Sequence, residues 1–182
     1  PTCTNSGDST SWTSGNRTIY YGCNDVGSGC NGSYSGGSAT YTTTTGQATI
    51  AAYTIKDNAG RTVTCPARTA NVYVDKSAPS VPTSVLRYDS SSGTVRTNTD
   101  TSWTNKTLWW GSFSSTDSGS GVNRYEFSEK CSGSVTGTLS SHYTYSSNKN
   151  NYYCIRAVDN VGLAMADPEN KDVDFSIYTK KF

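Results

Sequence analysis

The segment Asn151-Tyr152-Tyr153-Cys154-Ile155-Arg156-Ala157-Val158-Asp159-Asn160-Val161-Gly162 decides the fold class of this chain. Tyr153, Ile155 and Ala157 lie two positions apart, which places them on one face of an extended strand. The segment then ends in Asp-Asn-x-Gly, in which a polar side chain can bind backbone amides and the glycine can adopt a positive φ. We therefore predict a half-buried β-strand that is closed by a tight turn.

The same turn occurs at residues 57–60, and three further blocks recur in the same order in both halves of the chain. Their offsets drift, as expected of two copies of one fold with loops of unequal length. The linker Val74 to Pro79 separates the copies, because proline lacks an amide donor and tends to end a strand. We predict domains at residues 1–77 and 78–182, and we expect Pro1-Thr2 to be the same linker point one copy earlier in a longer array. The further blocks are Ser11 to Thr13, Asn16 to Gly22 and Asp25 to Gly29, which recur as Ser102 to Thr104, Asn105 to Gly111 and Asp117 to Gly121.

The composition favours thin β-sheets joined by many turns. The 182 residues include 13 Tyr, 4 Trp and 4 Phe in a chain otherwise rich in Ser, Thr, Gly and Asn. No segment approaches the roughly 20 apolar residues of a membrane-spanning helix, and no cluster of Lys and Arg forms a phosphate-binding face. The net charge is only +1. We expect an all-β protein with no membrane insertion and no nucleic-acid partner.

The six cysteines accompany a single His, and their spacing does not match a zinc site. Disulfides therefore explain them best, and persistent disulfides need an oxidising compartment. We expect an extracellular protein, either on the cell surface or secreted. If bridges stay within each half, the two cysteines of the second half must pair, whereas the four of the first half leave a crossed alternative open. The expected bridges are Cys3–Cys65, Cys23–Cys30 and Cys131–Cys154.

Several of these motifs resemble known extracellular repeats. Residues 79–162 resemble the fibronectin type III pattern, and the Asp-Lys-x-Ala-Pro linker with its two aspartate turns is similar to tandem Ig-like repeats of bacterial surface proteins. The resemblance implies two tandem Ig/fibronectin III-like β-sandwiches: residues 1–77, Ig-like and disulfide-rich, and residues 78–182, fibronectin III-like. It also implies a non-catalytic stalk or adhesion module of a larger surface protein, whose partners include neighbouring repeats of the same chain. The residues that carry it are Trp109-Trp110, Ser120 to Phe127 and Tyr153 to Asp159.

Adjacent aromatic residues offer the best indication of a ligand. Neighbours on a strand face opposite sides, so one member of Tyr20-Tyr21, and likewise of Trp109-Trp110, should be exposed. Trp109 shares its face with Phe113, which leaves Trp110 pointing outward. An outward Trp110 with Tyr143 or Tyr145 predicts a stacking platform for a glycan, so a carbohydrate-binding module is the alternative function. Cross-strand packing of these rings is the competing structural interpretation.

Two further features suggest a binding role. The Gly/Ser-rich stretch Gly27 to Gly37 would carry recognition if the chain were a host-protein-binding adhesin domain. Aspartates in the turns could supply oxygen ligands to Ca²⁺, but each stands nearly alone in the sequence, so capping of the turns is the expected role. We expect no cofactor and no bound metal. The weak calcium candidates are Asp25, Asp57, Asp117 and Asp159.

Nothing in the sequence indicates catalysis. His142 is the only histidine and has no carboxylate close to it in the chain. Glu126 and Glu129 lie three positions apart on an expected strand, so they point to opposite faces. No nucleophile motif is present. We therefore expect that the protein is not an enzyme.

Overall fold

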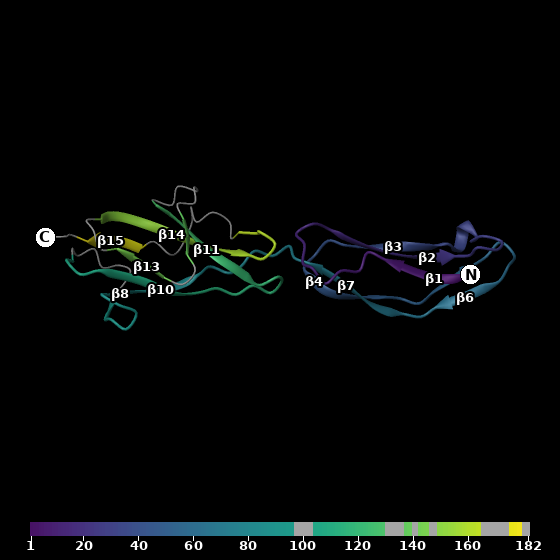
Figure 1. Ribbon diagram of the computed structural model, residues 1–182, viewed down its shortest axis with the longest axis horizontal. Helices are drawn as coiled ribbons and strands as arrows, with labels where there is room; N and C mark the ends of the chain where they lie inside the picture. The colour runs from purple at the N-terminus through teal and green to yellow at the C-terminus, as the bar shows by residue number, and fades with distance from the viewer. Residues whose placement is uncertain (97–103, 130–136, 140–141, 146–148, 165–174, 180–182) are drawn as a thin grey trace. The chain divides into compact units, whose positions relative to one another are not determined.

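The computed structural model describes residues 1–96, 104–129, 137–139, 142–145, 149–164 and 175–179 (Figure 1). Within these ranges the regular secondary structure is nearly all antiparallel β-strand, with a single 3-10 turn and no α-helix. None of the described helical residues forms a segment long and apolar enough to cross a membrane. The chain divides into two compact units, Pro1–Ser77 and Ala78–Phe182.

The first unit contains three small antiparallel sheets, ordered β1-β2-β3, β4-β7 and β5-β6. Its core forms where alternate residues of β2 and β7 meet, because every second side chain of a strand points to the same face. Ile19, Ala70 and Val72 are fully buried there, together with Ile50. The strands are β1 (Thr2–Ser6), β2 (Arg17–Asn24), β3 (Gly36–Tyr41), β4 (Thr45–Ile50), β5 (Tyr53–Lys56), β6 (Thr62–Cys65) and β7 (Arg68–Val74), and the 3-10 turn η1 is Gly32–Tyr34.

Residues 50–55 could be taken as one strand from their sequence, but the two ends of this stretch belong to separate strands. β4 ends at Ile50 and pairs with β7, whereas β5 begins at Tyr53 and pairs with β6. Both isoleucines are buried. Because they are five positions apart, one continuous strand would send them to opposite faces, and the break at residues 51–52 allows both to enter the interior.

The second unit contains two four-stranded antiparallel sheets, ordered β13-β10-β8-β9 and β12-β11-β14-β15. Ile155 and Ala157 on β14 are buried, which confirms the predicted alternation at these two positions; the side chain of Tyr153 lies outside the described residues. Leu108 and Phe127 are also buried. The strands are β8 (Thr83–Tyr88), β9 (Val95–Arg96), β10 (Leu108–Ser114), β11 (Val122–Glu129), β12 (Gly137–Leu139), β13 (His142–Tyr145), β14 (Lys149–Asp159) and β15 (Phe175–Thr179).

Two disulfides close loops in the first unit. The long bridge, Cys3–Cys65, joins residues 62 positions apart and ties β1 to β6, whereas the short bridge, Cys23–Cys30, joins residues 7 positions apart. Both predicted pairings are confirmed, and the crossed alternative is wrong. Cys131 lies outside the described residues, as does the side chain of Cys154, so the third bridge stays a prediction. The disulfides point to an oxidising environment.

Candidate functional site

The Asp-x-x-Ser-Gly turn is capped by its own aspartate in both units. Asp25 Oδ2 accepts a hydrogen bond from the Gly29 amide at 2.8 Å, and Asp117 Oδ2 accepts one from the Gly121 amide at 2.6 Å. Gly29 has a φ of +81° and Gly121 a φ of +84°, a conformation that glycine adopts at little cost. The predicted capping role of these aspartates is confirmed.

The Asp-Asn-x-Gly turn is closed in the same way. Asp57 Oδ1 accepts from the Arg61 amide at 2.8 Å, and Asp159 Oδ1 accepts from the Leu163 amide at 2.7 Å. The turn glycines again have a positive φ, +91° in the first unit and +88° in the second. The sequence thus identifies both turns and the side chains that cap them.

The two turns of each unit are joined to one another, which the sequence does not reveal. Asn58 Nδ2 donates to the Ser28 carbonyl at 2.9 Å, and Asn160 Nδ2 donates to the Ser120 carbonyl at 2.7 Å. The backbone amides of the same two asparagines also donate hydrogen bonds across the corner, to the Gly29 carbonyl at 2.9 Å in the first unit and to the Gly121 carbonyl at 3.1 Å in the second. We call this arrangement the double-turn corner: residues 25–29 with 57–61 in the first unit, and 117–121 with 159–163 in the second.

Cationic groups neutralise the corner of the first unit. Burial alone would raise the pKa of Asp57, but hydrogen bonds and charge from Arg61 outweigh it and hold the pKa below its usual range. The Asp57 carboxylate meets Arg61 Nε at 2.8 Å. Burial alone would also raise the pKa of Asp25. The hydrogen bond from the Gly29 amide and the Pro1 ammonium, which lies 3.5 Å from Asp25 Oδ1, outweigh burial and hold the pKa below its usual range.

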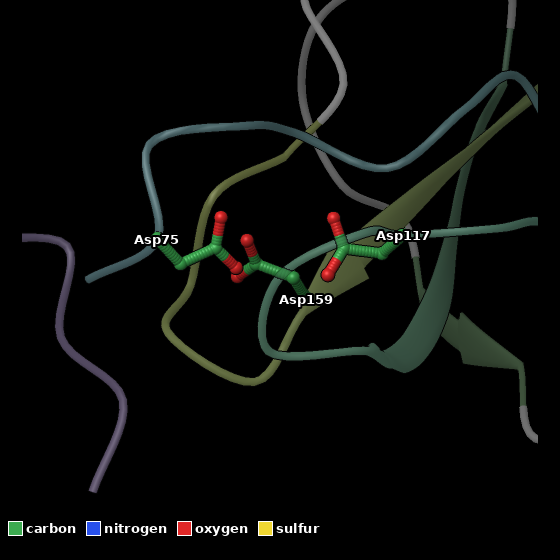
Figure 2. A group of neighbouring side chains, drawn as sticks. All are labelled: Asp75, Asp117 and Asp159. Carbon is green, nitrogen blue, oxygen red and sulfur yellow. The ribbon is translucent and has the colours of Figure 1, made fainter. Parts of the chain in front are cut away.

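The corner of the second unit has different surroundings. Leu163 stands where the first unit has Arg61, four positions after the turn aspartate. Asp117 and Asp159 come from separate loops and have carboxylate oxygens within 4.8 Å of each other (Figure 2). Asp117 Oδ1 is buried and has no hydrogen-bond partner among the described residues. Asp117 and Asp159, which stand apart in the sequence, thus lie close together in the folded unit.

This carboxylate pair could contribute to a site for a hard cation. Ca²⁺ takes six to eight oxygen ligands, of which Asp117 and Asp159 would supply only a few. Asp75, also drawn in Figure 2, belongs to the first unit, where its carboxylate accepts from the Ser77 amide at 3.0 Å. The chemistry that the corners perform with their described contacts is structural, since their oxygens hold backbone amides in place.

The predicted glycan platform is placed only in part. The register pairs Trp110 with Tyr143 and Leu108 with Tyr145 on neighbouring strands β10 and β13. The side chains of Trp110, Tyr143 and Tyr145 lie outside the described residues. A register shift between Gly111 and Ser114 interrupts the alternation by which Trp110 was expected to point outward.

Tyr20 and Tyr21 divide as expected for adjacent residues on a strand. The Tyr21 ring packs against the core cluster and lies 4.8 Å from the ring of Tyr53. Tyr20 is 57% exposed. The prediction that one member faces solvent is confirmed, and the position of Ile19 in the core decides which member it is.

The Gly27 to Gly37 stretch, the candidate loop for protein recognition, is braced at several points. The short bridge anchors it at Cys30, and the Asn31 amide donates to the Lys56 carbonyl at 2.8 Å. Asn31 also caps the 3-10 turn, since its side chain accepts from the Ser33 amide at 3.1 Å. The loop is thus fixed by covalent and backbone contacts.

Glu126 is a buried carboxylate whose two oxygens are both occupied. Arg124 Nη2 lies 2.6 Å from Oε1, and Arg156 Nη2 lies 2.7 Å from Oε2. Burial raises the pKa of Glu126, but the two arginines outweigh burial and hold the pKa below its usual range. A carboxylate held in this way does not act as a free base. The side chains of Glu129 and His142 lie outside the described residues.

Comparison of the chain with protein-family models, curated proteins and solved structures finds no match. Function is therefore inferred from the residues and their geometry alone.

Proposed function

We propose that the chain is a non-catalytic extracellular segment of a larger surface protein, in which two tandem Ig/fibronectin III-like β-sandwiches act as a rigid stalk or adhesion module. The observation that carries this proposal is the long bridge, which joins the first strand of the first unit to its sixth. A covalent tie of this kind is typical of domains whose apolar core is too thin to be stable alone. Neighbouring repeats are the partners that such a segment would have.

The double-turn corners support the same proposal. In each unit they connect two loops through side-chain and backbone hydrogen bonds, so the end of the unit is held in one conformation. Local opening is least frequent where loops carry many such contacts, and a spacer exposed to extracellular proteases benefits from that property.

Limited proteolysis of the full chain tests this proposal. With its disulfides intact, the chain should resist thermolysin at 25 °C, and after reduction the first unit should be cleaved while residues of the β11–β14 pair stay protected longer. Rapid cleavage of the oxidised chain between β1 and β7 would contradict a rigid spacer. The matched control is the Cys23→Ala/Cys30→Ala variant, which retains the long bridge and should stay resistant.

A further inference from the structure

The outward face of the sheet β1-β2-β3 carries an exposed aromatic ring among small residues. Ile19 is in the core and Tyr21 packs against it, so the alternate positions of β2 point away from the interior. Tyr20 lies at the middle of β2 on this outward face and is 57% exposed. The register places Ser6 directly opposite it on β1 and Ser38 directly opposite it on β3.

The residues that share this face are rich in hydroxyl groups. Thr18 and Thr40 lie next to each other, with their Oγ1 atoms 2.9 Å apart. Gly22 belongs to the same side, because a Cβ at this position would lie 3.3 Å from Thr4 Oγ1. None of the residues carries a formal charge. We call them the hydroxyl face: Thr2, Thr4, Ser6, Thr18, Tyr20, Gly22, Asn24, Gly36, Ser38 and Thr40.

The Tyr20 ring differs from another exposed tyrosine of the first unit. Tyr34 is 49% exposed, and Lys56 Nζ lies 5.8 Å from the centre of its ring. Among the described residues, neither a ring nor a cation lies against Tyr20. Ser6 and Ser38 are too short to cover its ring, so both their hydroxyl groups and the apolar surface of the ring remain accessible from one side.

We propose that the hydroxyl face binds a neutral polysaccharide, with one sugar ring stacked on Tyr20. The C–H face of a sugar is apolar and fits an exposed aromatic ring, which supplies a large apolar surface at low entropic cost. Serine and threonine hydroxyls both donate and accept hydrogen bonds, as sugar hydroxyls do. An anionic glycan would instead need cationic side chains, and the hydroxyl face has none. This function goes beyond that of a spacer, which needs no ligand.

The surroundings of Tyr20 also determine which contacts give affinity. Ser6 on β1 and Ser38 on β3 flank Tyr20 on the two neighbouring strands, about 4.8 Å from β2 on either side. Thr18 lies on β2 itself, opposite Thr40 on β3. Hydrogen bonds at a solvated surface contribute little net free energy, so the stacked ring should dominate binding. Removal of the ring should therefore abolish most of the affinity, whereas removal of the phenol hydroxyl should not.

Affinity electrophoresis of the full chain tests the proposal, with gels that contain a β-glucan, a xylan or a galactomannan, and heparin as the anionic control. We expect retardation by at least one neutral polymer and none by heparin. Tyr20→Ala should weaken binding about tenfold or more, whereas Tyr20→Phe should keep it within about threefold. Tyr34→Ala, the matched change at another exposed tyrosine, should bind as the parent chain does.

Three results would overturn the proposal: no retardation by any of the neutral polymers, retardation by heparin alone, or binding that Tyr20→Ala leaves intact. The Tyr20→Ala variant should keep the protease resistance of the parent chain in its oxidised form. Loss of glycan binding with resistance retained would leave the proposed stalk function standing, so the two proposals fail separately.

Discussion

The long bridge determines how far the first unit can extend under force. When the chain is pulled from its two ends, the force enters near Cys3, crosses the disulfide to Cys65 and leaves toward the second unit. The 61 residues between the two cysteines, which are 62 positions apart, therefore carry no load. Of the 77 residues in this unit, 77 less 61 leaves 16 outside the shielded segment while the bridge is intact.

The size of the effect follows from the length of an extended chain. At about 3.5 Å per residue, the shielded segment corresponds to roughly 210 Å of contour length, against about 55 Å for the residues outside it. In single-molecule force spectroscopy of the full oxidised chain, unfolding of the first unit should add only the short contour length of the residues outside the bridge. After reduction, the same unfolding step should lengthen by about 210 Å. A gain of this size is well above the increments that local rearrangements of a loop would produce.

Two variants separate the bridges in this experiment. Cys3→Ala/Cys65→Ala should show the long increment without reductant, because nothing shields the loop. Cys23→Ala/Cys30→Ala should behave as the oxidised parent chain, because its 7-residue loop lies wholly inside the shielded segment. The reasoning is refuted if the oxidised parent chain already extends by the length of the whole unit, or if loss of the short bridge alone lengthens the increment.

Further predictions concern stability. Removal of the long bridge should lower the free energy of unfolding of the first unit by about 4.3 kcal/mol, and removal of the short bridge by about 2.4 kcal/mol, because the cysteines are 62 and 7 positions apart. Urea unfolding monitored by hydrogen exchange measures both costs, and equal costs would contradict this order. Leu163→Arg should supply the second unit with the contact that Arg61 makes in the first and raise its Tm by about 2 °C at pH 7; calorimetry measures this, and an unchanged or lower Tm counts against the equivalence of the corners. Because the folded pKa of Glu126 is lowered, the unfolded state takes up the proton first; the stability it confers is complete above about pH 5 and falls as the pH drops toward the folded pKa. Glu126→Gln should flatten this acid dependence of the Tm between pH 3 and 6, and an unchanged slope would exclude Glu126 as its cause. Tyr20→Ala should change the free energy of unfolding by less than about 0.5 kcal/mol, since its ring is exposed; a larger loss in urea unfolding would mean that the ring supports the sheet.

Short-range chemistry made much of this protein predictable from its residues. Alternation identified the buried positions Ile155 and Ala157, because the period of a strand depends only on the backbone. The turn aspartates and glycines could be recognised because a turn satisfies its amides within about five residues. The sequence left two cysteine pairings open in the first unit, and the structure confirms the expected one.

Other features of the fold could not be predicted from the sequence, because they depend on contacts between segments that are distant along the chain. The break after Ile50 follows from which strands become neighbours, and no local motif marks it. The approach of Asp117 to Asp159, 42 positions apart, and the exposure of Tyr20 rather than Tyr21 depend on how loops and sheets pack. The sequence by itself determined the alternation of residues along the strands and the capped turns, because both obey local geometry. Tertiary structure alone decided which turns meet and which face of the sheet is left to solvent, because both depend on burial of an apolar core assembled from the whole unit.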